Sequence, residues 1–443
     1  MKTKAFLSLG ASLLLAAGVA SAQPVVIRIV ASNGDRQATQ RAIANVLTNW
    51  TFQGLNGSTA SATPGTLNVA TGSNFGAWNG SFNGQPVIVK TSYAGALAGI
   101  AAVASNPRVP QRFVVTDGTG AGSVPNPLTG TTEGTDFELG VADFGFSTNF
   151  QTTSPFRGAF EGRQYDLLNE EIVGVSPLGF YASPGFPADN ITTQLGQLLY
   201  TTGSLPVALF TGDWQNHGNQ IVYAIGRNTD AGQRFGAYAE LGLGVTATAQ
   251  VWQPTITGQT TQSGVTFGGT VGSHRLWPAE TVSGIFSPEG SGGFNAGATL
   301  APVLTAVLGP DAYKGKTVDP DTQVETFLYP NATAGYYIGY LTPGDANSRV
   351  IGGVVPAQNR GVALKFNGVE LTTANVQSGR YTAWLYNRLL RPQSGLTGLK
   401  ADFATALANE IKANTATEGG GIKNDASFRV RRTTDGGLVI PKP

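Results

Sequence analysis

Residues 227–234, with the sequence RNTDAGQR, combine features that could hold an anion. They lie between an apolar run, residues 221–225, and a helix-like stretch, residues 235–244. The first turn of a helix has unpaired N–H groups, and the helix dipole favours negative charge there. Arginine adds paired donors that match an oxyanion, and glycine lets the backbone come close. The same residues also fit a plain turn in which Arg227 pairs with a carboxylate, and this segment alone does not separate the two.

Residues for catalysis are scarce in this chain. The only histidines are His217 and His274, and neither lies in a Gly-x-Ser-x-Gly or His-Glu-x-x-His motif. A single histidine in a loop is more often a surface residue than a base or a metal ligand. The chain has no cysteine, which excludes thiolate metal sites and cysteine nucleophiles. We therefore expect a protein that is not an enzyme and that uses no metal and no cofactor.

The first 22 residues have the pattern of a secretory signal peptide. A cationic start, MKTK, precedes an apolar stretch and a small-residue cleavage pattern, Ala20 to Ala22. The apolar stretch is short for a membrane span, and no cysteine follows it to carry a lipid. We expect a periplasmic or secreted protein without a membrane anchor.

Length and charge narrow the class of protein further. The chain has 443 residues, too many for one ordinary core, so two lobes are expected. Its 28 basic and 27 acidic residues give a net charge of +1, which does not suit a nucleic-acid surface. Only 12% of the residues are charged while 60 are glycine, which predicts long polar loops.

Strand-like and helix-like segments alternate along the chain. Residues 25–31, VVIRIVA, predict a buried strand, followed by a helix that Asn33 or Asp35 could cap. Residues 88–104 repeat this pattern. Further helices are predicted at 298–309, 380–391 and 399–413, the last with an apolar stripe of Leu399, Phe403, Leu407 and Ile411. The alternation predicts an α/β fold in which each lobe has a mostly parallel sheet flanked by helices.

Two segments rich in glycine and threonine do not fit the alternation. Residues 118–136 lack apolar periodicity and predict a surface loop. Residues 251–272, which belong to the segment 251–275, alternate and contain many threonines, which predicts a hairpin or an irregular insertion.

The order of these segments resembles the periplasmic phosphate-binding proteins of phosphate ABC importers. RNTDAGQ, residues 227–233, matches the frame of the Arg-x-x-x-Ser-Gly-Thr motif with which that family clamps phosphate. DFGFST, residues 143–148, matches the family's Asp-Phe-Gly-Ala-Ser-Asp. The segments SPEGSGGFNAG, YYIGYLTPGDA and FNGVELTTANVQSGRYTAWLYNRL follow in the family's order. The matches cover most of the chain after the signal peptide.

This resemblance implies the two-lobed architecture of periplasmic binding proteins. The first lobe would comprise residues 23–148 and 345–443, and the second lobe residues 149–344. A small oxyanion, phosphate by default, would be captured in the cleft between the lobes. An ABC permease in the inner membrane would be the partner.

Several residues of this chain differ from the family's phosphate-binding residues at the matching positions. Arg227 and Gly232 keep the family's residue types, whereas Ala231 and Gln233 replace hydroxyl donors. Thr148 replaces the carboxylate that accepts a proton from bound phosphate. The expected ligand contacts are Arg227, Ala231, Gly232, Gln233, Arg234, Ser32, Asn33, Gly34, Ser92 and Thr148.

These exchanges bear on which ligand the protein binds. Each lost hydroxyl removes a bond worth roughly 1.5–3 kcal/mol, unless Gln233 or water replaces it. Without the carboxylate, fully ionised anions such as sulfate are no longer repelled. An alternative is a surface or extracellular matrix protein that has lost phosphate binding and uses residues 118–136 and 251–275 as interaction surfaces. An exported phosphatase-like enzyme ranks last, because the sequence offers no nucleophile and no metal ligands.

Overall fold

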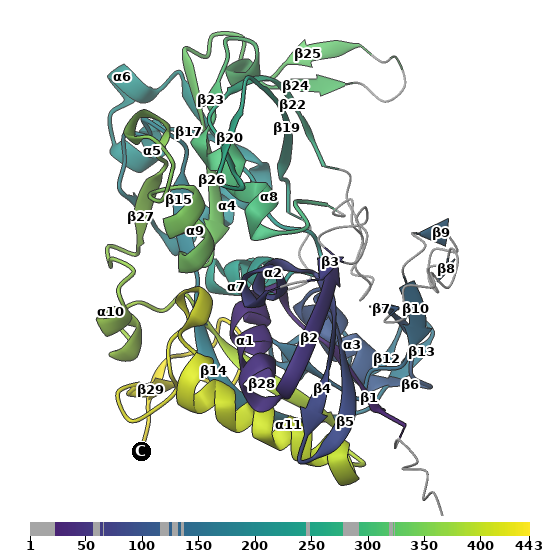
Figure 1. The fold of residues 1–443 in the computed structure, drawn as a ribbon. Helices are drawn as coiled ribbons and strands as arrows, with labels where there is room; N and C mark the ends of the chain where they lie inside the picture. Colours follow the sequence, from purple (N-terminus) through teal and green to yellow (C-terminus); the bar gives the residue numbers. More distant parts are fainter. Residues whose placement is uncertain are drawn as a thin grey trace, which may run out of the picture.

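The computed structural model describes residues 23–55, 63–64, 66–115, 124–125, 132–133, 137–244, 249–277, 292–318, 322 and 324–443. The expected signal peptide and most of residues 118–136 lie outside these ranges. Two large sheets, each with its own helices, form the two lobes of the molecule (Figure 1). The expected two-lobed α/β architecture is confirmed.

The first lobe is built on an eight-stranded sheet with the order β14-β28-β11-β1-β5-β4-β2-β3. Its central strand, β1 (Val25–Val30), pairs in parallel with β5 (Gln85–Ser92) and with β11 (Phe144–Ser147). Val30 lies opposite both Ser92 and Gly145. The carboxyl ends of the three strands therefore meet at one edge of the sheet, where α/β proteins commonly place their sites.

Helices pack on both sides of this sheet. Helix α1 (Arg36–Val46) follows β1 through a short 3-10 turn (Asn33–Asp35), and α3 (Ala96–Ala104) follows β5. Helix α11 (Gly398–Glu410) packs against α1, and its Phe403 and Leu407 are fully buried in the same apolar cluster as Ile43. The stripe expected for this helix is confirmed.

The expectation of a mostly parallel sheet is wrong for this lobe. Strands β4 (Phe75–Phe82), β2 (Thr48–Leu55) and β3 (Thr63–Pro64) continue the sheet in antiparallel fashion. The reason is local: Asn83 and Gly84 both have positive φ, 50° and 75°, which makes a tight hairpin between β4 and β5. Hairpin-linked strands are necessarily antiparallel.

The expected helix at 380–391 is also wrong, because this segment contains strand β28 (Trp384–Pro392). The strand runs antiparallel to β11 on one side and to β14 (Leu168–Pro177) on the other. Residues 384–390 are all buried, and this tertiary burial overrides the helix preference of leucine and arginine. Residues 168–177, which we expected in the second lobe, thereby form the edge of the first sheet.

The second lobe is built on a six-stranded sheet with the order β16-β27-β15-β26-β18-β17. Only β18–β26 and β16–β27 are parallel pairs among the described strands of this sheet. Residues 362–366, which we expected in the first lobe, lie in this sheet. The strands are β15 (Gly179–Ala182), β16 (Asn190–Ile191), β17 (Ser204–Pro206), β18 (Gln220–Ala224), β26 (Ala334–Leu341) and β27 (Val362–Phe366).

Residues 251–275 form a hairpin, one of the two forms expected. Strand β19 (Trp252–Thr257) pairs with β22 (Thr270–Leu276), and the smaller hairpin β20 (Thr260–Gln262) and β21 (Val265–Phe267) lies between them. The helix expected at 298–309 is split into α8 (Gly297–Leu300), a 3-10 turn and β23 (Val307–Leu308). Pro302 lies in the first turn of the 3-10 segment, where its missing N–H is tolerated.

Helix α7 (Gly232–Glu240) lies between the lobes (Figure 1). Its Phe235 packs with Leu97 and Leu390 of the first lobe, while its Ala237 and Tyr238 join the core of the second lobe. The same second-lobe cluster also includes Trp384 of strand β28. The two lobes therefore share continuous apolar packing around α7.

The other elements are short or peripheral. None of the helices in the described part of the chain is long and apolar enough to cross a lipid bilayer. The remaining helices are α2 (Leu67–Gly72), α4 (Thr193–Thr202), α5 (Ala208–Thr211), α6 (Trp214–His217), α9 (Pro343–Arg349) and α10 (Thr373–Gln377). The remaining strands are β6 (Ser105–Asn106), β7 (Gln111–Val114), β8 (Val124–Pro125), β9 (Thr132–Glu133), β10 (Phe137–Gly140), β12 (Gly158–Phe160), β13 (Arg163–Tyr165), β24 (Lys316–Val318), β25 (Glu325–Phe327), β29 (Val430–Arg431) and β30 (Ile440–Pro441).

Candidate functional site

The segment 227–234 connects strand β18 to helix α7, as its sequence indicates. Ala231 is the N-cap residue of α7 and has no side chain to cap the helix. The N–H groups of residues 232–234 have no acceptor among the described residues. Since residues 232–234 are buried, these donors form a small concentration of positive potential inside the molecule.

The turn lies directly against the first lobe. A Cβ atom on Gly232 would lie 2.1 Å from Thr148 Oγ1 and 2.5 Å from Asn149 Oδ1. Asn149 Nδ2 donates to the carbonyl oxygen of Gly232 over 3.4 Å, and Leu97 N donates to Asp230 O over 3.3 Å. Glycine at 232 is thus required for the contact between the lobes.

The turn after β1 supplies the facing surface of the first lobe. Ser32 caps the 3-10 turn, because its hydroxyl accepts a bond of 3.1 Å from Gly34 N. Asp35, one of the two expected caps, is the N-cap residue of helix α1, but its side chain makes no capping bond. A Cβ on Gly34 would lie 3.3 Å from Thr148 Cγ2 and 3.9 Å from Gln233 Nε2. The structure therefore brings Ser32, Gly34 and Thr148 together with Gln233.

Two other expected site residues contribute differently. Asn33 Nδ2 donates over 3.5 Å to Asn295 O, which links the first lobe to the second. Ser92 is buried at the end of β5, where its carbonyl accepts a bond of 2.9 Å from Ala31 N. Among the described contacts, the Ser92 hydroxyl makes no bond to the 227–234 turn.

Arg227 is 2% exposed, and each of its three guanidinium nitrogens has an acceptor within the protein. Nε donates to Phe294 O over 2.8 Å, Nη2 donates to Asn295 O over 2.9 Å, and Nη1 donates to Gln233 Oε1. Burial lowers the pKa of Arg227 to about 10, and the nearby carboxylate of Asp345 opposes this, so the group is charged at neutral pH. The described partners of the Arg227 guanidinium are two backbone carbonyl oxygens and the neutral amide of Gln233, and none of them is a carboxylate.

Arg234 fixes the neighbouring backbone instead of joining Arg227 at a shared site. Its Nη1 donates to Arg227 O over 3.1 Å and to Gly292 O over 2.7 Å. The guanidinium also lies 5.1 Å from the centre of the Tyr238 ring. This side chain therefore holds the segment that begins at Gly292 against the turn.

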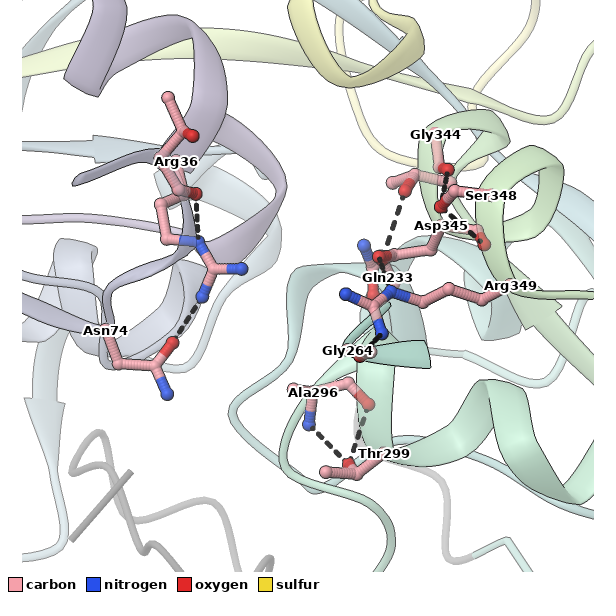
Figure 2. Close-up of polar contacts among 12 residues, drawn as sticks. Arg36, Asn74, Gln233, Gly264, Ala296, Thr299, Gly344, Asp345, Ser348 and Arg349 are labelled. Atoms are coloured by element: carbon pink, nitrogen blue, oxygen red, sulfur yellow. Dashed lines mark hydrogen bonds and ion pairs between the residues drawn. The ribbon is translucent and has the colours of Figure 1, made fainter. Parts of the chain in front are cut away.

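Two further arginines lie near this turn, and our sequence reasoning did not select them. Arg36, the first residue of α1, donates to Thr71 O over 3.1 Å and to Asn74 Oδ1. Arg349, the last residue of α9, lies 3.9 Å from Asp345. Figure 2 shows Arg36 and Asn74 across an opening from Gln233, Asp345 and Arg349. Arg36 begins the helix that follows strand β1, and that position is a signal that could have identified it. Arg349 lies at the far end of helix α9 and has no such signal.

Neither histidine forms part of this site. His274, expected at the surface, is buried against Trp252 with a distance of 4.3 Å between ring centres, and its Nδ1 lies 2.8 Å from Tyr337 Oη. Burial lowers the pKa of His274 to about 3, so the ring is neutral. His217 Nδ1 lies 2.9 Å from Thr211 Oγ1. Within the described ranges, no group of three or more histidine or acidic residues is placed to hold a metal ion.

Comparison with known proteins gives matches only among solved structures. No protein-family model matches the sequence, and no curated protein matches it. An ABC-type phosphate transport receptor from Vibrio cholerae aligns with a TM-score of 0.42 at 12% identity, over 89% of this chain and 99% of that chain. PstS from Borrelia burgdorferi aligns with a TM-score of 0.35 at 10% identity, over 90% of this chain and 98% of that chain.

Proposed function

We propose that the protein is a solute-binding protein that captures a small oxyanion, phosphate by default, between its two lobes. The observation that supports this most is the position of the 227–234 turn. The Arg227 guanidinium and the N–H groups at the start of α7, which have no acceptor among the described residues, are buried where this turn contacts Gly34 and Thr148 of the first lobe. Positive charge that faces a contact between lobes favours an anion there.

Capture at Arg227 requires Gln233 to move. Its amide oxygen occupies the Nη1 donor, so an arriving anion must replace it. A hydrogen bond to a charged group is worth roughly 1.5–3 kcal/mol, and the anion recovers this through charge-assisted bonds to the same guanidinium. The site is therefore proposed to bind an oxyanion more weakly than a site whose arginine is free.

Selectivity is proposed to be broad among tetrahedral anions. Thr148, which lies beside Gly34 and Gly232, brings a hydroxyl in place of a carboxylate. A carboxylate would repel a fully ionised ligand, whereas a hydroxyl accepts or donates a hydrogen bond. Phosphate, arsenate and sulfate are thus all candidate ligands.

Titration calorimetry on the chain that begins at Gln23, with phosphate, sulfate and arsenate, tests the proposal. Binding of at least one anion that is lost in Arg227→Gln supports it. Arg163→Gln is the matched control, because Arg163 is exposed on strand β13, and it should bind as the wild type does. If none of the three anions binds in the titration, the proposal is wrong.

Transport is the expected use of such a capture. In this proposal an exported binding protein passes its anion to a membrane permease, and it has no catalytic role. Release requires the contact between Gly232 and Thr148 to open, because this contact closes the site. A variant with no change in anion binding but no uptake would locate the permease contact on the surface of a lobe.

A second candidate is a surface or matrix protein in which this turn is only a structural joint. The observation that favours it is that every guanidinium nitrogen of Arg227 already has an acceptor within the protein. In addition, Gly264 of the 251–275 hairpin reaches the opening, where its carbonyl accepts a bond of 3.4 Å from Arg349 Nη1. Two results together would favour this second candidate: no anion binds in the calorimetric titration, and Arg227→Lys lowers the midpoint of thermal unfolding. The midpoint should fall because lysine cannot reproduce the three divergent hydrogen bonds of the guanidinium group.

A further inference from the structure

Arg36 and Arg349 approach one opening from opposite lobes (Figure 2). Arg36 begins helix α1 of the first lobe, and Arg349 ends helix α9 of the second lobe. Burial lowers the pKa of Arg36, and the positive charge of Arg349 lowers it further. Two like charges that act on each other across an opening are unfavourable, and an anion between them would relieve the repulsion.

Both side chains retain hydrogen-bond donors. Arg36 uses Nε and Nη1 for Thr71 and Asn74, and its Nη2 has no acceptor among the described residues. Arg349 makes one long bond of 3.4 Å to Gly264 O, and its Nε lies 3.9 Å from Asp345, beyond hydrogen-bond length. Arg227 differs, because each of its nitrogens is already bonded.

The charges around the opening do not balance. Asp345 opposes the lowering of the pKa of both Arg36 and Arg227, so it interacts with both guanidinium groups. With Arg349 included, three arginines lie near Asp345, which is more positive charge than this one carboxylate can balance. A dianion suits this excess better than a singly charged or neutral solute.

Exposure separates the outer arginines from the inner one. The side chain of Arg349 is 30% exposed and Arg36 is half-buried, whereas Arg227 is 2% exposed. A phosphoryl group held by the outer pair keeps one side towards solvent, so an organic substituent on it has room to extend. The inner turn is closed by the contact between Gly232 and Thr148 and would accept a bare ion only.

We infer that Arg36 and Arg349 form an outer anion site that takes phosphate monoesters as well as inorganic phosphate. The planar donors of the two guanidinium groups match phosphoryl oxygens in pairs. The inference rests on the proposed function, because it needs anions to enter the opening between the lobes. The outer site uses other side chains than oxyanion capture at the 227–234 turn does. An experiment can therefore contradict one of the two proposals and leave the other standing.

Calorimetric titration with inorganic phosphate and with β-glycerophosphate, a monoester, tests the outer site. The variants are Arg36→Gln, Arg349→Gln and Arg227→Gln, with Arg163→Gln as the exposed control. Each outer variant should weaken monoester binding by about tenfold or more, which corresponds to one lost charge-assisted bond, and the control should match the wild type. Arg227→Gln should affect inorganic phosphate more than the monoester.

Each other outcome overturns at least one proposal. Monoester binding that survives in both outer variants overturns the outer site, and the proposed function still stands if phosphate binding depends on Arg227. Phosphate binding without any monoester binding overturns the outer site in the same way. If the wild-type protein binds neither compound, both proposals fail. Should Arg36→Gln not fold, Arg349→Gln decides alone, because its side chain is partly exposed at the end of a helix.

Discussion

Gln233 Oε1 accepts a hydrogen bond from Arg227 Nη1 across a single turn of chain. Gln233 stands at the position where the resemblance to phosphate-binding proteins implies a threonine hydroxyl. A threonine side chain is too short to bond the guanidinium in this way, so the exchange places a neutral, internal acceptor on the donor that an anion would use. The affinity of this protein for anions is therefore linked to the mobility of one amide side chain.

Gln233→Ala should bind oxyanions more tightly than the wild type. The substitution removes the acceptor that competes for Arg227, and a hydrogen bond to a charged group is worth roughly 1.5–3 kcal/mol, so affinity should rise by about tenfold or more. Calorimetry with phosphate measures the change. Gln164→Ala, on the exposed side of β13, is the control and should leave binding unaltered. Weaker binding in Gln233→Ala would show instead that the amide itself contacts the ligand.

The local elements of this fold follow from the sequence. Strand β1 and helix α11 were predicted by apolar periodicity, because a strand buried in the centre of a sheet and a helix with one buried face each leave a clear pattern. The strand–turn–helix arrangement at 227–234 was predicted for the same reason. Strand β28 was missed, because its buried leucines and arginines have the composition of a helix and only its neighbours β11 and β14 make it a strand.

The contacts of the candidate site could not be predicted to the same extent. The carbonyl groups that bond Arg227 belong to Phe294 and Asn295, which are far along the chain and have no side-chain signal for this role. Arg36 and Arg349 come to face each other only when the two lobes are assembled, because they lie on helices α1 and α9 of different lobes. The residue types in a motif indicate which kind of site it could form. The hydrogen-bond partners of a charged side chain in that motif depend on residues that packing brings from elsewhere in the chain.

Gly232→Ala should destabilise the protein. The added methyl group would lie 2.1 Å from Thr148 Oγ1, so the contact between the lobes must shift, and overpacking of this kind costs roughly 1–3 kcal/mol. Urea unfolding measures the loss. Gly72→Ala in helix α2 is the matched control, because nothing lies within 4 Å of its added methyl group. A Gly232→Ala protein as stable as the control would mean that the lobes are not held together at this turn.

The stability of the protein should fall as pH rises towards neutrality, through Glu240 at the end of α7. Burial raises the pKa of Glu240 from its ordinary value of 4.5 to about 7, against the opposing effect of Arg432, while Asp435 adds to the rise. The folded protein thus holds this proton more tightly than the unfolded chain. The resulting contribution to the free energy of unfolding is complete below pH 4.5 and is lost as pH rises to about 7.

Urea unfolding at several pH values measures this dependence. Glu240→Gln should flatten the slope between pH 4.5 and about 7, because its amide does not titrate. Glu161→Gln, at an exposed position, should keep the slope of the wild type. An identical slope in the wild type and in Glu240→Gln would assign the dependence to other groups.

Thr148→Asp should restore discrimination between phosphate and sulfate. A carboxylate at this position would lie against Gly34 and Gly232, close to the amide of Gln233. It can accept a hydrogen bond from the P–OH group of monoprotonated phosphate, whereas it repels sulfate, which carries no proton at neutral pH. Calorimetry should therefore show a loss of sulfate binding by about tenfold or more with phosphate affected less. Thr148→Val is the uncharged control of similar shape, and it should weaken both anions alike. Little loss of either anion in Thr148→Asp would place the bound anion away from residue 148, towards the outer arginines.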